Sequence, residues 1–273
     1  MAGFLSEVCA EARVRVAEAA RHEPLEALRA RALERPAAPG FASALSGDEL
    51  AVIAEVKRAS PSRGRLAAIP DPARLARRYA RGGAVAVSVL TEPAHFAGSL
   101  DDLAAVAAAG LPVLRKDFIV DPYQVWEARA AGAAAVLLIV AALGQPDLAH
   151  LLRVAASAGL DALIEVHDRA ETARAAAAHT RAATGRTLVI GVNARDLTTL
   201  QVDPDRFASV RDALPAGALA VAESGVRGPD DVRRLAALGA DAVLVGEHVA
   251  TAEDPAAAVM ALVQAGVRQE VRQ

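Results

Sequence analysis

The sequence contains only two lysines, Lys57 and Lys116, although lysine and arginine together number 30. Arginine carries the same charge but keeps its proton in proteins, whereas a lysine ammonium can give its proton away. A chain that uses arginine almost everywhere else has therefore kept lysine at two positions where proton transfer would explain the choice. The alternative is chance survival of two surface lysines, and the positions of both residues in the fold decide between these interpretations.

Eight short apolar runs rich in β-branched residues recur at intervals of about 22 to 33 residues, the length of a strand-plus-helix unit. They span residues 51–57, 84–91, 112–118, 134–140, 161–167, 188–193, 219–225 and 242–247. Runs that are almost continuously hydrophobic are typical of parallel strands covered on both faces. Ala-rich amphipathic segments separate the runs, and several of these begin at Asp-Pro and end at glycine, as helices do.

Strict alternation of eight strands with helices predicts an α/β fold, a single (β/α)8 TIM barrel that forms one domain over residues 1–273. An open, doubly wound sheet is the alternative, but no Gly-x-Gly-x-x-Gly motif follows the first strand. Residues 1–40 precede the first strand and carry an apolar stripe at helical spacing that includes Phe4, Val8 and Ala12. We predict that residues 1–40 form an N-terminal helical extension packed on the barrel.

Five of the predicted strands end in charged or amide side chains. These side chains belong to Glu55 and Lys57, Lys116, Glu165, Asn193 and Glu223. Alternation along a strand places Glu55 and Lys57 on one face, and the active site of such a barrel lies at the carboxyl ends of its strands. Both lysines therefore fall where acid–base chemistry is expected. An ion pair that fills the barrel is the structural alternative for Glu55 and Lys57, but it does not account for all five strand ends.

Three predicted loops offer groups that could bind an anion. The loop after the first strand carries three arginines, Arg58, Arg63 and Arg65. It could close over a negatively charged substrate, or it could be an ordinary solvated loop. Ser224 and Gly225 follow the seventh strand, and Gly246 and Glu247 follow the eighth. Glycine lets backbone N–H groups approach an anion, and these two loops form the usual phosphate site of the fold, so we predict a phosphorylated small-molecule substrate.

Composition and charge exclude several classes of protein. A formal net charge of −3 and an aromatic content of 3% argue against a nucleic-acid partner. No apolar run approaches the roughly 18 residues of a membrane span, and the N-terminal residues are too charged for a secretory signal. The single cysteine, Cys9, cannot form an internal disulfide, and the six histidines show no metal-ligand spacing. We therefore expect a cytoplasmic protein with no metal, no nucleic-acid partner and no membrane association.

Several segments resemble the indole-3-glycerol phosphate synthase family, in the order in which that family has them. The most specific are residues 53–64, IAEVKRASPSRG, and residues 112–125, PVLRKDFIVDPYQV. The others are residues 88–92, 96–100, 162–168, 190–197, 221–226 and 243–247. The helical extension of the family matches residues 1–40. Ala194 and His248 depart from the family pattern, which commonly has a second Asn at the first position and a smaller residue at the second.

The resemblance implies a carbon–carbon lyase of tryptophan biosynthesis that uses no metal or organic cofactor. Its reaction is ring closure, decarboxylation and dehydration of a carboxyphenylamino-deoxyribulose phosphate to indole-3-glycerol phosphate. The resemblance also implies that Lys116 is the general acid toward the substrate ketone and that Glu165 is the general base of the dehydration. Lys57, oriented by Glu55, would pair with substrate anions. Asn193 and Glu223 would shape the site, and the implied contacts to substrate or phosphate are Ser60, Phe96 (toward the anthranilate ring), Arg195, Ser224, Gly225, Gly246 and Glu247.

Two other functions remain open from the sequence. An isomerase or a Schiff-base aldolase acting on a phosphorylated sugar would also place a lysine at a strand end. A catalytically silent barrel could bind a phosphorylated metabolite as a sensor. The complete set of lysines and glutamates argues against the sensor, and borohydride trapping would distinguish an aldolase from the lyase, which we favour. A monomer is the expected oligomeric state.

Overall fold

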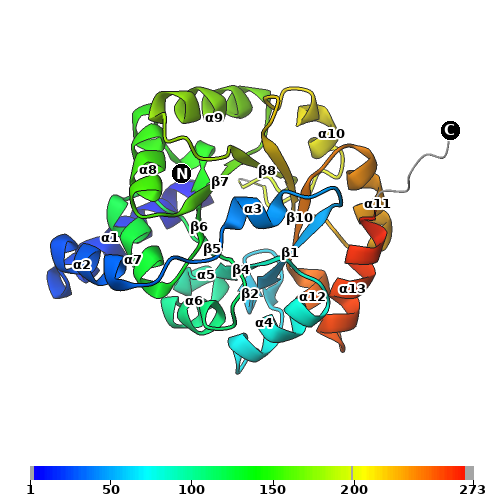
Figure 1. Ribbon diagram of the computed structural model, residues 1–273, viewed down its shortest axis with the longest axis horizontal. Coiled ribbons are helices and arrows are strands. Elements are labelled where there is room, and N and C mark those ends of the chain that lie inside the picture. The colour runs from blue at the N-terminus through cyan, green and yellow to red at the C-terminus, as the bar shows by residue number, and fades with distance from the viewer. Residues whose placement is uncertain (1–2, 198, 268–273) are drawn as a thin grey trace.

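The computed structural model describes residues 3–197 and 199–267, and its centre is a closed barrel of eight parallel strands (Figure 1). The order around the ring is β1-β10-β9-β8-β7-β6-β5-β4. The strands are β1 (Ala51–Val56), β4 (Ala86–Leu90), β5 (Val113–Lys116), β6 (Ala135–Ile139), β7 (Asp161–Val166), β8 (Val189–Asn193), β9 (Leu219–Glu223) and β10 (Ala242–Val245). Each strand lies inside one of the eight predicted runs, and the predicted (β/α)8 barrel is confirmed.

Helices surround the barrel on its outside (Figure 1). The longer ones after the strands are α4 (Pro72–Arg81), α6 (Leu100–Ala107), α7 (Pro122–Ala131), α8 (Gln145–Ser157), α9 (Arg169–Ala182), α10 (Arg206–Arg211), α11 (Pro229–Ala237) and α13 (Pro255–Ala265). Short elements are the β2 (Ala59–Ser60) and β3 (Gly64–Arg65) hairpin, α5 (Pro93–Phe96), η1 (Val140–Ala142) and α12 (Glu247–Ala250). No helix in the described part of the chain combines the length and apolar character of a membrane span.

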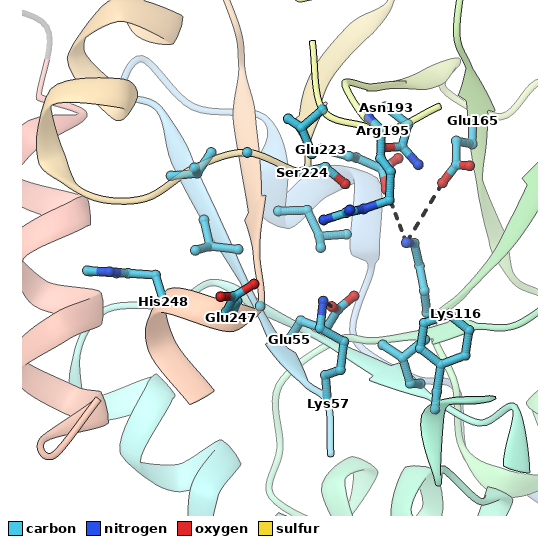
Figure 2. A pocket seen from close by; sticks show the side chains of 18 of the residues that line it. Glu55, Lys57, Lys116, Glu165, Asn193, Arg195, Glu223, Ser224, Glu247 and His248 are labelled. Atoms are coloured by element: carbon cyan, nitrogen blue, oxygen red, sulfur yellow. Dashed lines mark hydrogen bonds and ion pairs between the residues drawn. The ribbon is translucent and has the colours of Figure 1, made fainter. Parts of the chain in front are cut away.

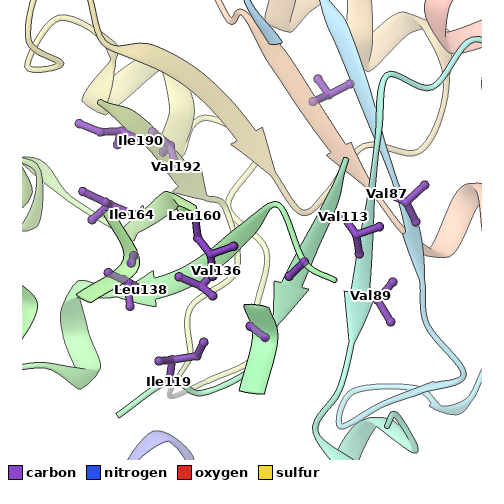
Figure 3. Close-up of a cluster of buried hydrophobic side chains, with 14 of the residues drawn as sticks. Val87, Val89, Val113, Ile119, Val136, Leu138, Leu160, Ile164, Ile190 and Val192 are labelled. Carbon is purple, nitrogen blue, oxygen red and sulfur yellow. The ribbon is translucent and has the colours of Figure 1, made fainter. Parts of the chain in front are cut away.

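Alternation along the strands produces two apolar layers. Val52 and Ala54 point outward from β1 into the layer between strands and helices, which Figure 3 shows around β5 to β8. Ile53 of β1 and Leu114 of β5 point inward and fill the barrel. Because each strand buries both of its faces, the hydrophobic runs are nearly continuous.

The N-terminal residues form three helices, α1 (Phe4–His22), α2 (Leu25–Glu34) and α3 (Phe41–Leu45). The predicted extension is present as α1 and α2, and α2 packs against α7. Phe41 and Leu45 of α3 belong to the inner apolar cluster. The backbone N–H of Ala42 also donates to the Asp161 carboxylate at the start of β7, 2.9 Å away. Helix α3 therefore covers the amino ends of the strands and leaves their carboxyl ends to the site.

Helix α1 reaches the opposite, carboxyl end of the barrel through Arg15. Its guanidinium lies 3.6 Å from the buried Glu92 carboxylate and 3.4 Å from that of Asp117. Glu92 accepts hydrogen bonds from the backbone N–H groups that open α5, the helix that carries Phe96. Asp117 directly follows Lys116 at the end of β5. The extension is thus tied by charge to two segments that line the candidate site.

Candidate active site

A cavity of about 570 Å³ opens at the carboxyl ends of the strands, where the sequence predicts the active site. Side chains from β1, β5, β7, β8 and β9 project into it (Figure 2). Among the predicted residues, twelve line the cavity: Glu55, Lys57, Phe96, Lys116, Glu165, Asn193, Arg195, Glu223, Ser224, Gly225, Gly246 and Glu247. Both lysines of the chain line the cavity, so the alternative of two surface lysines retained by chance is wrong.

Lys116 extends from the end of β5 into a group of carboxylates. Its Nζ lies 3.4 Å from Oε2 of Glu223 and 3.7 Å from Oε2 of Glu165 (Figure 2). Burial alone would lower the pKa of Lys116, but the charges of Glu223, Glu165 and Glu55 outweigh burial and raise it above its ordinary value. The ammonium therefore keeps its proton at neutral pH and can offer it to a substrate oxygen that arrives between these groups.

Glu223, at the end of β9, lies in the same buried cluster, and its pKa is also raised. Burial raises its pKa to about 8, against the lowering effect of Lys116 and with a further increase from Glu165. Burial thus disfavours the charged form of Glu223, whereas Lys116, 3.4 Å away, favours it. Gly191 on β8 makes room for this side chain, because a Cβ at position 191 would collide with Oε1 of Glu223.

Glu55 and Lys57 form an ion pair at the end of β1, with 3.0 Å between Oε1 and Nζ. The Ser88 hydroxyl donates to the other carboxylate oxygen of Glu55 over 3.2 Å. Burial would raise the pKa of Glu55, yet Lys57 and Lys116 hold it below its usual range. The structural alternative of an ion pair is therefore present, but the pair faces the cavity, where Lys57 can also meet a substrate anion.

The loops after β9 and β10 form one side of the cavity. Ser224 and Gly225 both have positive φ angles, 65° and 78°, so the chain turns sharply at this point. Gly246 precedes α12, and a Cβ there would lie 2.5 Å from Oε1 of Glu55 and 3.1 Å from Nζ of Lys57. Backbone at Gly246 therefore comes closer to the ion pair than any other residue type would allow.

The opposite wall is apolar. Phe96 and Phe118 line it with ring centroids 6.3 Å apart, beside Leu137 and Ile139. An apolar wall facing a charged group of acids and bases suits a substrate with one aromatic and one anionic end. Phe118 is a cavity residue that was not predicted, and its position two residues after Lys116 is a signal that points to it.

The three loop arginines have different roles. Arg58 pairs with Asp102 and donates to the Ile69 carbonyl oxygen over 2.8 Å, so it fixes the loop. Arg63 lines the cavity and lies 3.2 Å from the Glu247 carboxylate. Arg65 is exposed and is not part of the cavity wall. The prediction that the loop offers cations to an anion therefore fits Arg63 alone.

Ser60 is outside the cavity wall, and Asn193 is on the wall with its side-chain oxygen already hydrogen-bonded. Ser60 is buried in the β2–β3 hairpin and is not among the residues that line the cavity. Asn193 faces the cavity, but its Oδ1 accepts a hydrogen bond from the backbone N–H of Arg195 over 2.9 Å. Arg195 in turn donates to the carbonyl oxygen of Leu200 over 2.8 Å. Ala194 is buried and lies outside the cavity wall, as strand alternation predicts, whereas His248 is part of it.

Comparison with known proteins agrees with this geometry. The family model described as indole-3-glycerol phosphate synthase matches residues 5–262. The indole-3-glycerol phosphate synthase of Mycolicibacterium vanbaalenii is 56% identical over 243 residues, which cover 89% of this chain and 87% of the relative. Indole-3-glycerol phosphate synthase 1 of Streptomyces coelicolor is 53% identical over 270 residues, which cover 98% and 97%.

Solved structures that resemble the chain share its fold at low identity. The 3-hexulose-6-phosphate synthase of Salmonella typhimurium superposes with a TM-score of 0.59 at 17% identity, covering 79% of this chain and 98% of that one. The thiamine phosphate pyrophosphorylase of Pyrococcus furiosus gives 0.56 at 17%, covering 79% and 94%. These two similarities bear on the barrel alone, whereas the family match and the relatives above 50% identity cover nearly the whole sequence. The chain therefore belongs to the indole-3-glycerol phosphate synthase family, the carboxy-lyases of tryptophan biosynthesis.

Proposed function

We propose that Lys116 is the general acid and Glu165 the general base of the ring-closing reaction. The observation that carries this proposal is that the two groups enter one cavity from β5 and β7 and lie 3.7 Å apart. Lys116 Nζ donates its proton to the substrate ketone oxygen while the aromatic ring carbon bonds to the ketone carbon. Loss of CO₂ restores the aromatic ring. The hydroxyl group formed from the ketone then takes a proton from a lysine ammonium of the site and leaves as water, while Glu165 accepts the proton that the neighbouring carbon of the new ring releases.

The charges around Lys116 support its role as acid. Because Glu165, Glu223 and Glu55 surround the Lys116 amine, it carries its proton before the substrate binds and does not need to take one from solvent. Glu165 is buried, and its Oε2 faces the cavity beside Lys116, where it can accept a proton from the substrate. Glu223 and Asn193 shape the site, since one balances the charge of Lys116 and the other orders the turn before Arg195.

The substrate of this family is a phosphorylated small molecule. We place its anthranilate ring against Phe96 and its anionic groups near Lys57, which Glu55 orients. The phosphate contacts we propose are the backbone of Gly225, Gly246 and Glu247 together with Ser224 and Arg195, all on the cavity wall. Ser60 would contribute only through the loop that contains it. We also propose that the enzyme acts as a cytoplasmic monomer without metal or organic cofactor, and without nucleic-acid or membrane partners.

The Gly246→Ala substitution tests the phosphate side of the cavity. The added methyl group would displace the Glu55 carboxylate and the Lys57 ammonium, so we expect KM for the phosphorylated substrate to rise roughly tenfold, which corresponds to about 1.4 kcal/mol of binding free energy. Gly228→Ala is the matched control, because a Cβ at position 228 meets nothing within 4 Å. Steady-state kinetics on both variants make the comparison, and an unchanged KM in Gly246→Ala would remove this loop from the binding site.

Incubation with the carboxyphenylamino-deoxyribulose phosphate, followed by indole absorbance, tests the overall reaction. Formation of indole-3-glycerol phosphate supports the lyase, whereas thermal stabilisation by the compound without product would indicate a sensor. Borohydride added during turnover distinguishes the aldolase alternative, since a Schiff base on Lys57 or Lys116 would be trapped as a covalent adduct. We expect product and no adduct by mass spectrometry.

A further inference from the structure

A histidine that the proposed mechanism does not use lies directly behind Glu165. His167 follows β7, and its Nε2 is 3.7 Å from Oε1 of Glu165. Its Nδ1 is 3.0 Å from Oε2 of Glu171 on α9. The same Glu171 oxygen accepts a hydrogen bond from the backbone N–H of His167 over 2.7 Å. Glu171 therefore contacts both the backbone and the ring of His167, and the other ring nitrogen points toward Glu165.

The facing atoms of Glu165 and His167 are both buried. Among the described residues, neither Oε1 of Glu165 nor Nε2 of His167 has a hydrogen-bond partner. The other oxygen of Glu165 faces Lys116, 3.7 Å away. A small rotation of either side chain would bring Oε1 and Nε2 within hydrogen-bond distance. Glu165 thus lies between two groups that can carry positive charge, one in the cavity and one behind it.

The charged groups around His167 favour its protonated form. Burial lowers the pKa of His167, but the hydrogen bond that its ring donates to Glu171 and the charges of Glu165 and Glu171 raise the pKa above its ordinary value, and Arg206 opposes this increase. A second cavity, of about 680 Å³, borders His167 on the side of α9 and α10. The other charged residues on its wall are Asp168, Arg169, Asp196 and Asp203.

We propose that His167 is the positioning residue of the general base: its imidazolium holds Oε1 of Glu165, so that Oε2 stays directed into the cavity to accept the substrate proton. This inference rests on the proposed role of Glu165. Glu171 completes the arrangement by fixing the ring, in the way that a carboxylate orients a histidine in many catalytic sites.

The pH dependence of kcat/KM in His167→Gln tests the proposal. Glutamine keeps a hydrogen-bond donor but has no charge, so a proton binds Glu165 more readily and the acid limb of the profile should move up by about one pH unit. His150→Gln is the matched control, since His150 is exposed on α8 and lines neither cavity. An acid limb that stays in place in His167→Gln, whatever the loss of rate, would mean that His167 only packs there.

A titration of the His167 imidazole by NMR provides a readout that does not depend on activity. Coupling between two sites is reciprocal, so Glu165→Gln must lower the pKa of His167 if the two charges interact. We expect a decrease of about one unit relative to the unsubstituted enzyme. An unchanged His167 pKa overturns the inference even if Glu165→Gln abolishes turnover. Conversely, full turnover in Glu165→Gln would refute the proposed base while the coupling could still be measured.

Discussion

Replacement of Lys116 by arginine is expected to lower kcat by roughly 10²- to 10⁴-fold, the usual contribution of a general acid. Arginine keeps the positive charge that Glu223, Glu165 and Glu55 surround, so the fold should tolerate the change. It cannot release a proton to the ketone oxygen, because its guanidinium stays charged in proteins. Both CO₂ release and indole formation should fall together, since the acid acts in the first bond-forming step.

The contrast with Lys116→Met separates the chemical role of the ammonium from its electrostatic one. Methionine leaves buried carboxylates without their cation, and breaking a buried pair in this way typically costs 3–5 kcal/mol of stability. We therefore expect the methionine variant to be inactive and less stable by chemical denaturation, and the arginine variant to be inactive at near-normal stability. Near-normal turnover in Lys116→Arg would show that proton donation comes from elsewhere.

Replacement of Glu165 by glutamine is expected to lower the rate of indole formation by roughly 10²- to 10⁴-fold as well. The amide has the shape of the carboxylate but cannot take up a proton. Because Glu165 acts in the dehydration, condensation and CO₂ release should continue in the first turnover while indole formation lags behind. A rapid-quench measurement of both products on one sample makes this comparison.

Glu253→Gln serves as the control for Glu165→Gln, because it removes the same charge from an exposed position outside the cavity. It should leave both rates unchanged. Equal slowing of CO₂ release and indole formation in Glu165→Gln would place Glu165 in an earlier step than the dehydration. Unchanged rates would exclude it as a base altogether.

The strand ends could be predicted from the sequence because alternation and the barrel fold together determine which residues point inward. Glu55, Lys57 and Lys116 were placed correctly for that reason, since a strand end allows little freedom of direction. Loop residues are less constrained. Arg58 and Arg63 look equivalent in the sequence. Arg58 pairs with Asp102, which lies 44 residues further along the chain and makes Arg58 a structural residue, whereas Arg63 lies on the cavity wall.

Features that depend on a third residue could not be predicted. Gly191 reads as a weak point in a strand until Glu223 on the neighbouring strand is seen to fill the space that its missing side chain leaves. In the sequence, His167 looks like the beginning of a loop. The direction of its ring depends on Glu171 in the first turn of α9, and that contact is visible only in the structure. Long-range packing supplies this information, and a single sequence records it only indirectly.

The contact between Arg15 and Asp117 has a consequence for how the enzyme is made. Helix α1 leaves the ribosome early, but Asp117 is synthesised 102 residues later, which takes roughly 5 to 20 s at 5–20 residues per second. During that interval Val8, Cys9 and Ala12, which are buried in the finished enzyme, have no barrel to cover them. The nascent chain therefore has to keep its first helix from associating with other polypeptides until β5 has been translated.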